Sequence, residues 1–215
     1  MKVKLAYSKD EELKPLLPLL NGRINNRGYD FEVAKIKEDE IKFNLNNFDL
    51  LFIPLPVLTL VKDIKILTNG SNVTEKLFIK RIKEDKILKL LVSGTNSTEF
   101  YLAKILINSN IMPAFSNYNS VINYNDGDLD LYNEWVKYCG KVPIVLSVLG
   151  SVRLSDDELL KLKVIIRDSA SLMVNEGEVE STSKELGLKG REAIECFFKL
   201  CREKGLCNEV KLSLL

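Results

Sequence analysis

The sequence predicts an α/β protein with two lobes, each a sheet flanked by helices. Apolar, β-branched runs typical of strands alternate with helical patterns along the chain. A second set of strand, helix and strand fills residues 86–141, and a long β-branched run at 142–152 then leads back to the first sheet. We therefore expect a larger lobe of residues 1–85 and 142–215, a smaller inserted lobe of residues 86–141, and a ligand cleft between them.

The first part of the chain has the order strand, helix, strand, helix, strand. These elements are expected at residues 3–7, 10–20, 30–36, 39–45 and 49–54. Asp10 is placed to cap the first helix, whose leucines share one face. The last run, DLLFIP, is almost unbroken in its apolar character, as is typical of a central parallel strand.

The rest of the chain continues the alternation of strands and helices. The expected elements are strands at 64–67, 75–81, 88–92 and 142–152, and helices at 100–107, 155–174, 181–187 and 189–204. The first two strands are separated by NGSN at 69–72, which predicts a turn. Ser155 and Glu158 have the spacing of a capping box at the start of a helix.

The composition excludes several classes of function. Thirty-one Lys and Arg residues against thirty Asp and Glu residues leave a net charge of +1 without a basic block, so no nucleic-acid partner is expected. The chain has no histidine, which excludes Ser-His-Asp and Cys-His relays as well as His-ligated metals. Phosphate-binding glycine motifs are also missing from the sequence, so we expect no cofactor.

The four cysteines and the N-terminus bear on the cellular setting. The N-terminal residues lack the apolar stretch of a signal peptide, so we expect a cytoplasmic protein with reduced thiols. Cys196, Cys201 and Cys207 lack the C-x-x-C spacing of a zinc site, and no metal is expected. No apolar run approaches the roughly 18 residues that span a bilayer, so no membrane partner is expected.

Hydroxyl side chains at two places are candidates for ligand binding. Thr95, Ser97 and Thr98 precede or open the helix expected at 100–107, where free N–H groups favour an anion such as a carboxylate or phosphate. Ser8 lies at the carboxyl end of the first strand, where α/β sheets bind ligands. The alternative for both places is an ordinary helix cap, which is also the favoured role of Asp10.

A third candidate site contains Asn133 and Glu134, which precede Trp135. Glu134 could supply a carboxylate to the cleft, with Trp135 as an aromatic wall. The alternative is a solvated glutamate beside a half-buried tryptophan.

Five segments together resemble a family of two-lobed enzymes. They are AYSKD at 6–10, FDLLFIP at 48–54, SGTNSTEFYLAKIL at 93–106, GDLDLYNEW at 127–135 and VPIVLSVLGSVR at 142–153. The chain resembles the solute-binding-protein-like enzymes of the futalosine route to menaquinone, 1,4-dihydroxy-6-naphthoate synthase and chorismate dehydratase. It is also similar to an archaeal family related to solute-binding proteins.

The resemblance implies a type II periplasmic-binding-protein-like fold and assigns several residues to the site. Ser8 and Asp10 match a Ser-Pro-Asp motif in which Lys9 replaces proline, and Ser97 and Thr98 match a Thr-Thr pair. Glu134 matches the acid of a His-Glu pair, with Asn133 in place of the histidine. An amide cannot accept a proton at neutral pH, so this replacement argues against the naphthoate synthase reaction.

Three functions follow as hypotheses. The first is a protein that binds a small anionic metabolite bearing a carboxylate, with or without an aromatic ring. The second is a carbon–oxygen lyase resembling chorismate dehydratase, and the third is an interaction protein that kept the fold without the activity. A monomer or homodimer is expected in each case.

Overall fold

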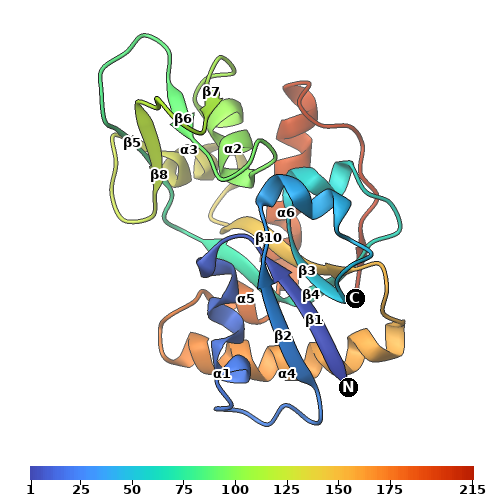
Figure 1. Ribbon diagram of the computed structural model, residues 1–215. Coiled ribbons are helices and arrows are strands. Elements are labelled where there is room, and N and C mark those ends of the chain that lie inside the picture. Colours follow the sequence, from blue (N-terminus) through green and yellow to red (C-terminus); the bar gives the residue numbers. More distant parts are fainter.

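Two sheets with flanking helices form two lobes in the computed structural model, which describes residues 1–215 (Figure 1). The chain crosses between the sheets twice, at residues 75–77 and 140–143. This is the predicted α/β arrangement of two helix-flanked sheets.

The larger sheet has six strands in the order β11-β4-β10-β3-β1-β2. Their bounds are β1 Lys2–Tyr7, β2 Asp30–Lys35, β3 Leu50–Pro54, β4 Lys65–Thr74, β10 Ile144–Ser151 and β11 Ser213–Leu214. β1 pairs in parallel with β2 and β3, whereas β10 runs antiparallel to β3 and β4. All five residues of β3 are buried, as the unbroken apolar run predicts.

Helices cover the larger sheet and connect its strands. They are the 3₁₀ helices η1 Asp10–Leu16, η2 Glu38–Phe43 and η3 Leu55–Thr59, and the α-helices α1 Leu17–Leu20, α4 Asp156–Asn175, α5 Ser181–Lys184 and α6 Gly187–Glu203. The predicted capping box at the start of α4 is confirmed, because Ser155 N–H donates to Glu158 Oε2 at 2.9 Å and Glu158 N–H donates to Ser155 Oγ at 3.3 Å. None of the helices is both long and apolar enough to cross a membrane.

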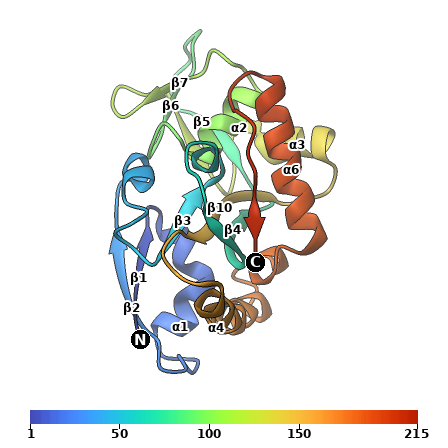
Figure 2. The same cartoon turned by 90° about the vertical axis from the view of Figure 1, so that its right-hand side faces the viewer.

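The smaller sheet has five strands in the order β7-β6-β8-β5-β9. Their bounds are β5 Phe78–Arg81, β6 Lys89–Leu91, β7 Met112–Ala114, β8 Ser120–Asn123 and β9 Leu129–Asp130, and the helices of this lobe are α2 Thr98–Leu106 and α3 Leu131–Cys139. β5 belongs to this sheet, so the sheet begins before residue 86. α6 packs against α2 and α3 as well as β10, and therefore contacts elements of both lobes (Figure 2).

The predicted turn at 69–72 is wrong, because β4 continues through it. Gly70 has a φ of +78°, and the pairing of β4 with β10 is irregular between Val145 and Leu149. A β-carbon on Gly70 would lie 2.7 Å from Ile166 Cγ2. The glycine thus allows an irregular strand to pass close to α4 without reversing the chain.

The expectation of reduced thiols is also contradicted. Cys139 is bonded to Cys196, and Cys201 is bonded to Cys207. The first bond joins α3 of the smaller lobe to α6. These two helices pack against each other, and the Cα atoms of Cys139 and Cys196 are 5.9 Å apart. Sequence spacing could not reveal this pairing, because 57 positions separate the two residues.

Candidate functional site

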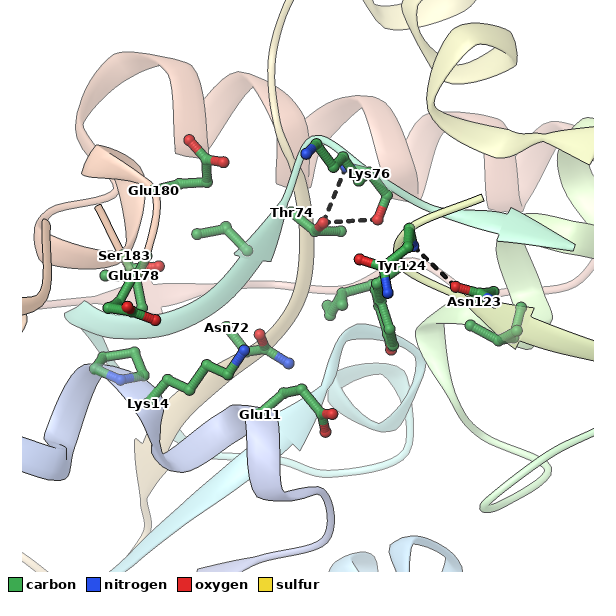
Figure 3. A pocket seen from close by; sticks show the side chains of 16 residues that line it. Glu11, Lys14, Asn72, Thr74, Lys76, Asn123, Tyr124, Glu178, Glu180 and Ser183 are labelled. Atoms are coloured by element: carbon green, nitrogen blue, oxygen red, sulfur yellow. Dashed lines mark hydrogen bonds between the residues drawn. The ribbon is translucent and has the colours of Figure 1, made fainter. Parts of the chain in front are cut away.

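A cavity of about 680 Å³ lies between the lobes and is called the interlobe cavity below (Figure 3). Its walls come from η1, β4 and the α4–α5 connection of the larger lobe and from β8 with the residues that follow it in the smaller lobe. The lining residues are Glu11, Lys14, Pro15, Asn72, Val73, Thr74, Lys76, Ile122, Asn123, Tyr124, Asn125, Leu146, Glu178, Val179, Glu180 and Ser183.

A second cavity of about 370 Å³ adjoins the first and shares Glu11, Ile122 and Tyr124 with it. We call it the inner cavity. Besides apolar side chains of β6 and β8, its lining includes Lys9 and Glu99. The two cavities therefore have part of their walls in common at the junction of the lobes.

A buried charge cluster, made of Lys9, Glu12, Glu38 and Glu99, borders the inner cavity. Lys9 Nζ lies 2.7 Å from Glu99 Oε1 and 2.8 Å from Glu38 Oε2. Tyr124 donates its hydroxyl to Glu99 Oε1 at 2.8 Å. Burial alone would lower the pKa of Lys9, but the charges of Glu99 and Glu38 raise it above its ordinary value.

The pKa values of the three carboxyl groups in this cluster are shifted in different directions. Burial raises the pKa of Glu38 to about 7 despite the opposing charge of Lys9. Burial acts on Glu99 in the same direction, but Lys9 and hydrogen bonds lower its pKa below the ordinary value. Burial also raises the pKa of Glu12, although the backbone N–H groups of Ser8 and Lys9 donate to this carboxylate at 2.8 Å and 3.1 Å. One ammonium thus faces three buried carboxyl groups, and burial raises the pKa of two of them, Glu12 and Glu38.

The predicted anion site at the start of α2 contains carboxylates of the protein itself. Thr95 donates its backbone N–H and its hydroxyl to Asp39 Oδ1 at 2.8 Å and 3.1 Å. Ser93 Oγ donates to Glu38 Oε1 at 3.1 Å. Ser97 caps α2 by accepting from Phe100 N–H at 3.1 Å, so the alternative role of a helix cap is confirmed for this residue.

Thr98 has a connecting role at the same helix terminus. Its fully buried hydroxyl donates to the carbonyl of Leu146 in β10 and accepts from Leu55 N–H, at 2.5 Å and 3.0 Å. The start of α2 is therefore fixed to the larger lobe. Ser97, by contrast, also lines the inner cavity.

The remaining predicted residues lie in different places. Ser8, at the end of β1, donates its hydroxyl to Glu12 Oε2 at 3.2 Å and so adjoins the buried charge cluster. Asp10 does not cap η1, because Lys9 occupies the cap position; Asp10 instead pairs with Lys35 at 2.8 Å on the surface.

Asn133 and Glu134 are placed on α3 and line neither the interlobe cavity nor the inner cavity. Glu134 pairs with Lys137 on the same helix at 2.6 Å. Trp135 is fully buried rather than half-buried, and its indole N–H donates to the carbonyl of Val142 at 2.9 Å.

Sequence reasoning singled out Ser97, which lines the inner cavity, but it missed other residues that line the two cavities. Glu99 lies in the first turn of a helix, where acidic residues are common because they interact favourably with the helix dipole. The sequence therefore gives no sign that Glu99 is buried in a charge cluster. Lys9 does carry a signal, because it stands where the resembling family has proline. Asn72 and Ser183 carry none, since they fall in segments that were expected to be a turn and a helix.

The comparisons with known proteins concern the fold. No protein-family model and no curated protein matches the sequence. Protein AF1704 from Archaeoglobus fulgidus is similar in structure with a TM-score of 0.78 and 13% identity, covering 95% of this chain and 98% of that chain. The CA3427 gene product of Candida albicans, which has the generic periplasmic binding protein fold, is similar with a TM-score of 0.60 and 11% identity, covering 98% and 92%.

A third similar structure is a solute-binding protein with its ligand. It is the alkanesulfonate-binding protein SsuA from Xanthomonas axonopodis pv. citri bound to MOPS, with a TM-score of 0.56, 9% identity and coverage of 100% and 98%. At such low identity these likenesses show the fold alone. The predicted periplasmic-binding-protein-like fold is thereby confirmed, and it is a fold that binds ligands in its solute-binding members.

Proposed function

We propose that the protein binds a small carboxylate-bearing metabolite in the interlobe cavity. The proposal rests on Lys14 and Lys76, which line this cavity and take part in none of the ion pairs of the structure. Lys9, the other lysine at the lobe junction, is already held by two carboxylates. The two free ammonium groups are thus available to an anionic group of a ligand.

The size and the walls of the cavity support this proposal. A volume of about 680 Å³ falls in the range of small-molecule sites, roughly 300–1,000 Å³. Asn123 and Asn125 add amide groups, and the ring of Tyr124 offers a surface for an aromatic or apolar part of the ligand. Because the walls belong to both lobes, a ligand here would hold the lobes together.

Isothermal titration calorimetry tests the proposal with chorismate, shikimate, benzoate, succinate and L-amino acids. We expect at least one of them to bind, and Lys14→Met and Lys76→Met each to weaken that binding about tenfold, the effect of losing one charge-assisted contact. Lys199→Met is the matched control, because Lys199 is exposed on α6 and lines neither cavity. Its affinity should equal that of the unaltered protein.

The proposal fails if none of these compounds gives heat, or if folded Lys14→Met and Lys76→Met proteins bind as tightly as the control. The chorismate sample also tests the lyase alternative. A product lighter by one water, detected by mass analysis, would favour that alternative over binding alone.

A further inference from the structure

The α4–α5 connection gives one wall of the interlobe cavity a negative character. Glu178 and Glu180 line the cavity there, and neither forms an ion pair in the structure. Glu11 adds a third free carboxylate from η1. The lining thus contains three carboxylates and the two ammonium groups of Lys14 and Lys76, which gives it a net charge of −1.

Two buried polar side chains lie close to this wall without a partner. Asn72 is 8% exposed and Ser183 is 1% exposed, both line the cavity, and the side chain of neither forms a hydrogen bond within the protein. Their polar atoms reach the cavity, unlike Ser71 Oγ and Ser147 Oγ, which are sealed in the interior without a partner. Figure 3 shows Asn72 on β4 at the centre of the cavity, with Glu178 and Ser183 together on the adjacent wall. Because buried polar groups are normally hydrogen-bonded, these two point to a ligand.

We infer that this wall binds an ammonium group of the ligand, so that the ligand of the proposed function is an amino-acid-like zwitterion. Glu178 and Glu180 supply the negative charge, and the oxygens of Asn72 and Ser183 can accept hydrogen bonds from the ammonium. The carboxylate of the same ligand binds Lys14 on the η1 wall. This inference rests on the proposed function and adds a second charged group to its ligand.

The charge balance distinguishes a zwitterion from a simple anion. A simple anion would add negative charge to a lining that is already negative, whereas a zwitterion adds none. The environment of Glu180 supports the same choice, because partial burial and the nearby charge of Glu75 raise the pKa of its carboxyl despite Lys76. A bound ammonium would counteract both effects.

Matched pairs of ligands test the inference by calorimetry. L-Phenylalanine is compared with 3-phenylpropanoate, L-leucine with 4-methylpentanoate, and L-glutamate with glutarate; within each pair only the α-amino group differs. We expect the amino acid to bind at least about tenfold more tightly in the pair that binds best, the worth of one charge-assisted contact.

The double variant Glu178→Gln/Glu180→Gln should remove this advantage while leaving the affinity for the deaminated acid unchanged or higher. Glu192→Gln on α6 is the control, since Glu192 is exposed and lines neither cavity. If the deaminated acids bind as tightly as the amino acids, or the double variant keeps the full preference, the inference is overturned and the proposed function stands. If no carboxylate binds with or without an amino group, both are overturned.

Discussion

Lys9 Nζ lies 2.7 Å and 2.8 Å from the two carboxylate oxygens of Glu99, and this is the only ion pair that joins the two lobes. Lys9 directly precedes η1 in the larger lobe, and Glu99 lies in the first turn of α2 in the smaller lobe. Their side chains are 16% and 4% exposed, so salt screens this pair less than the surface pairs. The relation of the lobes around the cavities therefore depends on charges that are shielded from solvent.

Replacement of Lys9 by methionine should strongly destabilise the protein. The change leaves Glu38 and Glu99 buried without their shared cation, and breaking a buried pair in this way costs about 3–5 kcal/mol. Urea unfolding followed by circular dichroism measures the loss. Lys35→Met is the control, because its ion pair with Asp10 is on the surface and should change stability little. Equal effects of the two substitutions would contradict a stabilising role for the buried cluster.

The free energy of unfolding should depend on pH through the titration of Glu38. Its pKa is raised from 4.5 to about 7, so between these values the folded protein binds more protons than the unfolded chain. The free energy of unfolding should then fall as pH rises from about 4.5 to about 7, by on the order of 2–3 kcal/mol from this residue. Glu38→Gln should lose this part of the slope in urea titrations at pH 5, 6, 7 and 8. A variant with the same slope as the unaltered protein would show that Glu38 does not titrate in this range.

Several strands and the two longest helices, α4 and α6, were predictable because each is encoded locally. The apolar run at 49–54 indicates a buried strand by itself, and Ser155 with Glu158 marks the start of α4 across three positions. Contacts that define the site are not local. Lys9 and Glu99 are separated by 90 positions, and only the folded chain brings the start of η1 and the start of α2 together.

The predicted turn at 69–72 is wrong for a related reason. Asn-Gly-Ser-Asn is typical of turns, but pairing with β10 and packing against α4 keep β4 extended through it. Thr95 and Ser97 do lie at an electropositive helix terminus, yet Asp39 reaches Thr95 from a different element. Tertiary contacts thus override the local turn pattern in β4 and place a carboxylate of the protein beside Thr95.

Thr98→Val should test how firmly α2 is attached to the larger lobe. The two side chains have nearly the same shape, but valine leaves Leu55 N–H without its hydrogen-bond acceptor and removes the hydrogen bond that the carbonyl of Leu146 accepts. Unsatisfied buried groups of this kind cost about 1–3 kcal/mol. Thr59→Val is the comparison, because the Thr59 hydroxyl is only partly buried and makes a single hydrogen bond to Pro56. A loss in urea unfolding no larger than that of Thr59→Val would contradict the connecting role.

The two disulfides should contribute unequally to stability. In the chain-entropy treatment, the bond between Cys139 and Cys196, with a sequence separation of 57, stabilises by about 4 kcal/mol, and the bond between Cys201 and Cys207, with a separation of 6, by about 2 kcal/mol. Paired alanine substitutions should therefore lower the melting temperature more at the first bond than at the second.

Thiol titration of the denatured, unreduced protein provides the direct measurement and should find no free thiol. Such bonds persist in oxidising compartments and in the cytoplasm of hyperthermophiles, so the predicted cytoplasmic location would require an organism of the second kind. Four titratable thiols in freshly purified protein would instead restore the original expectation of reduced cysteines. In that case the attachment of α3 to α6 would depend on packing alone, and reducing agents would leave the melting temperature unchanged.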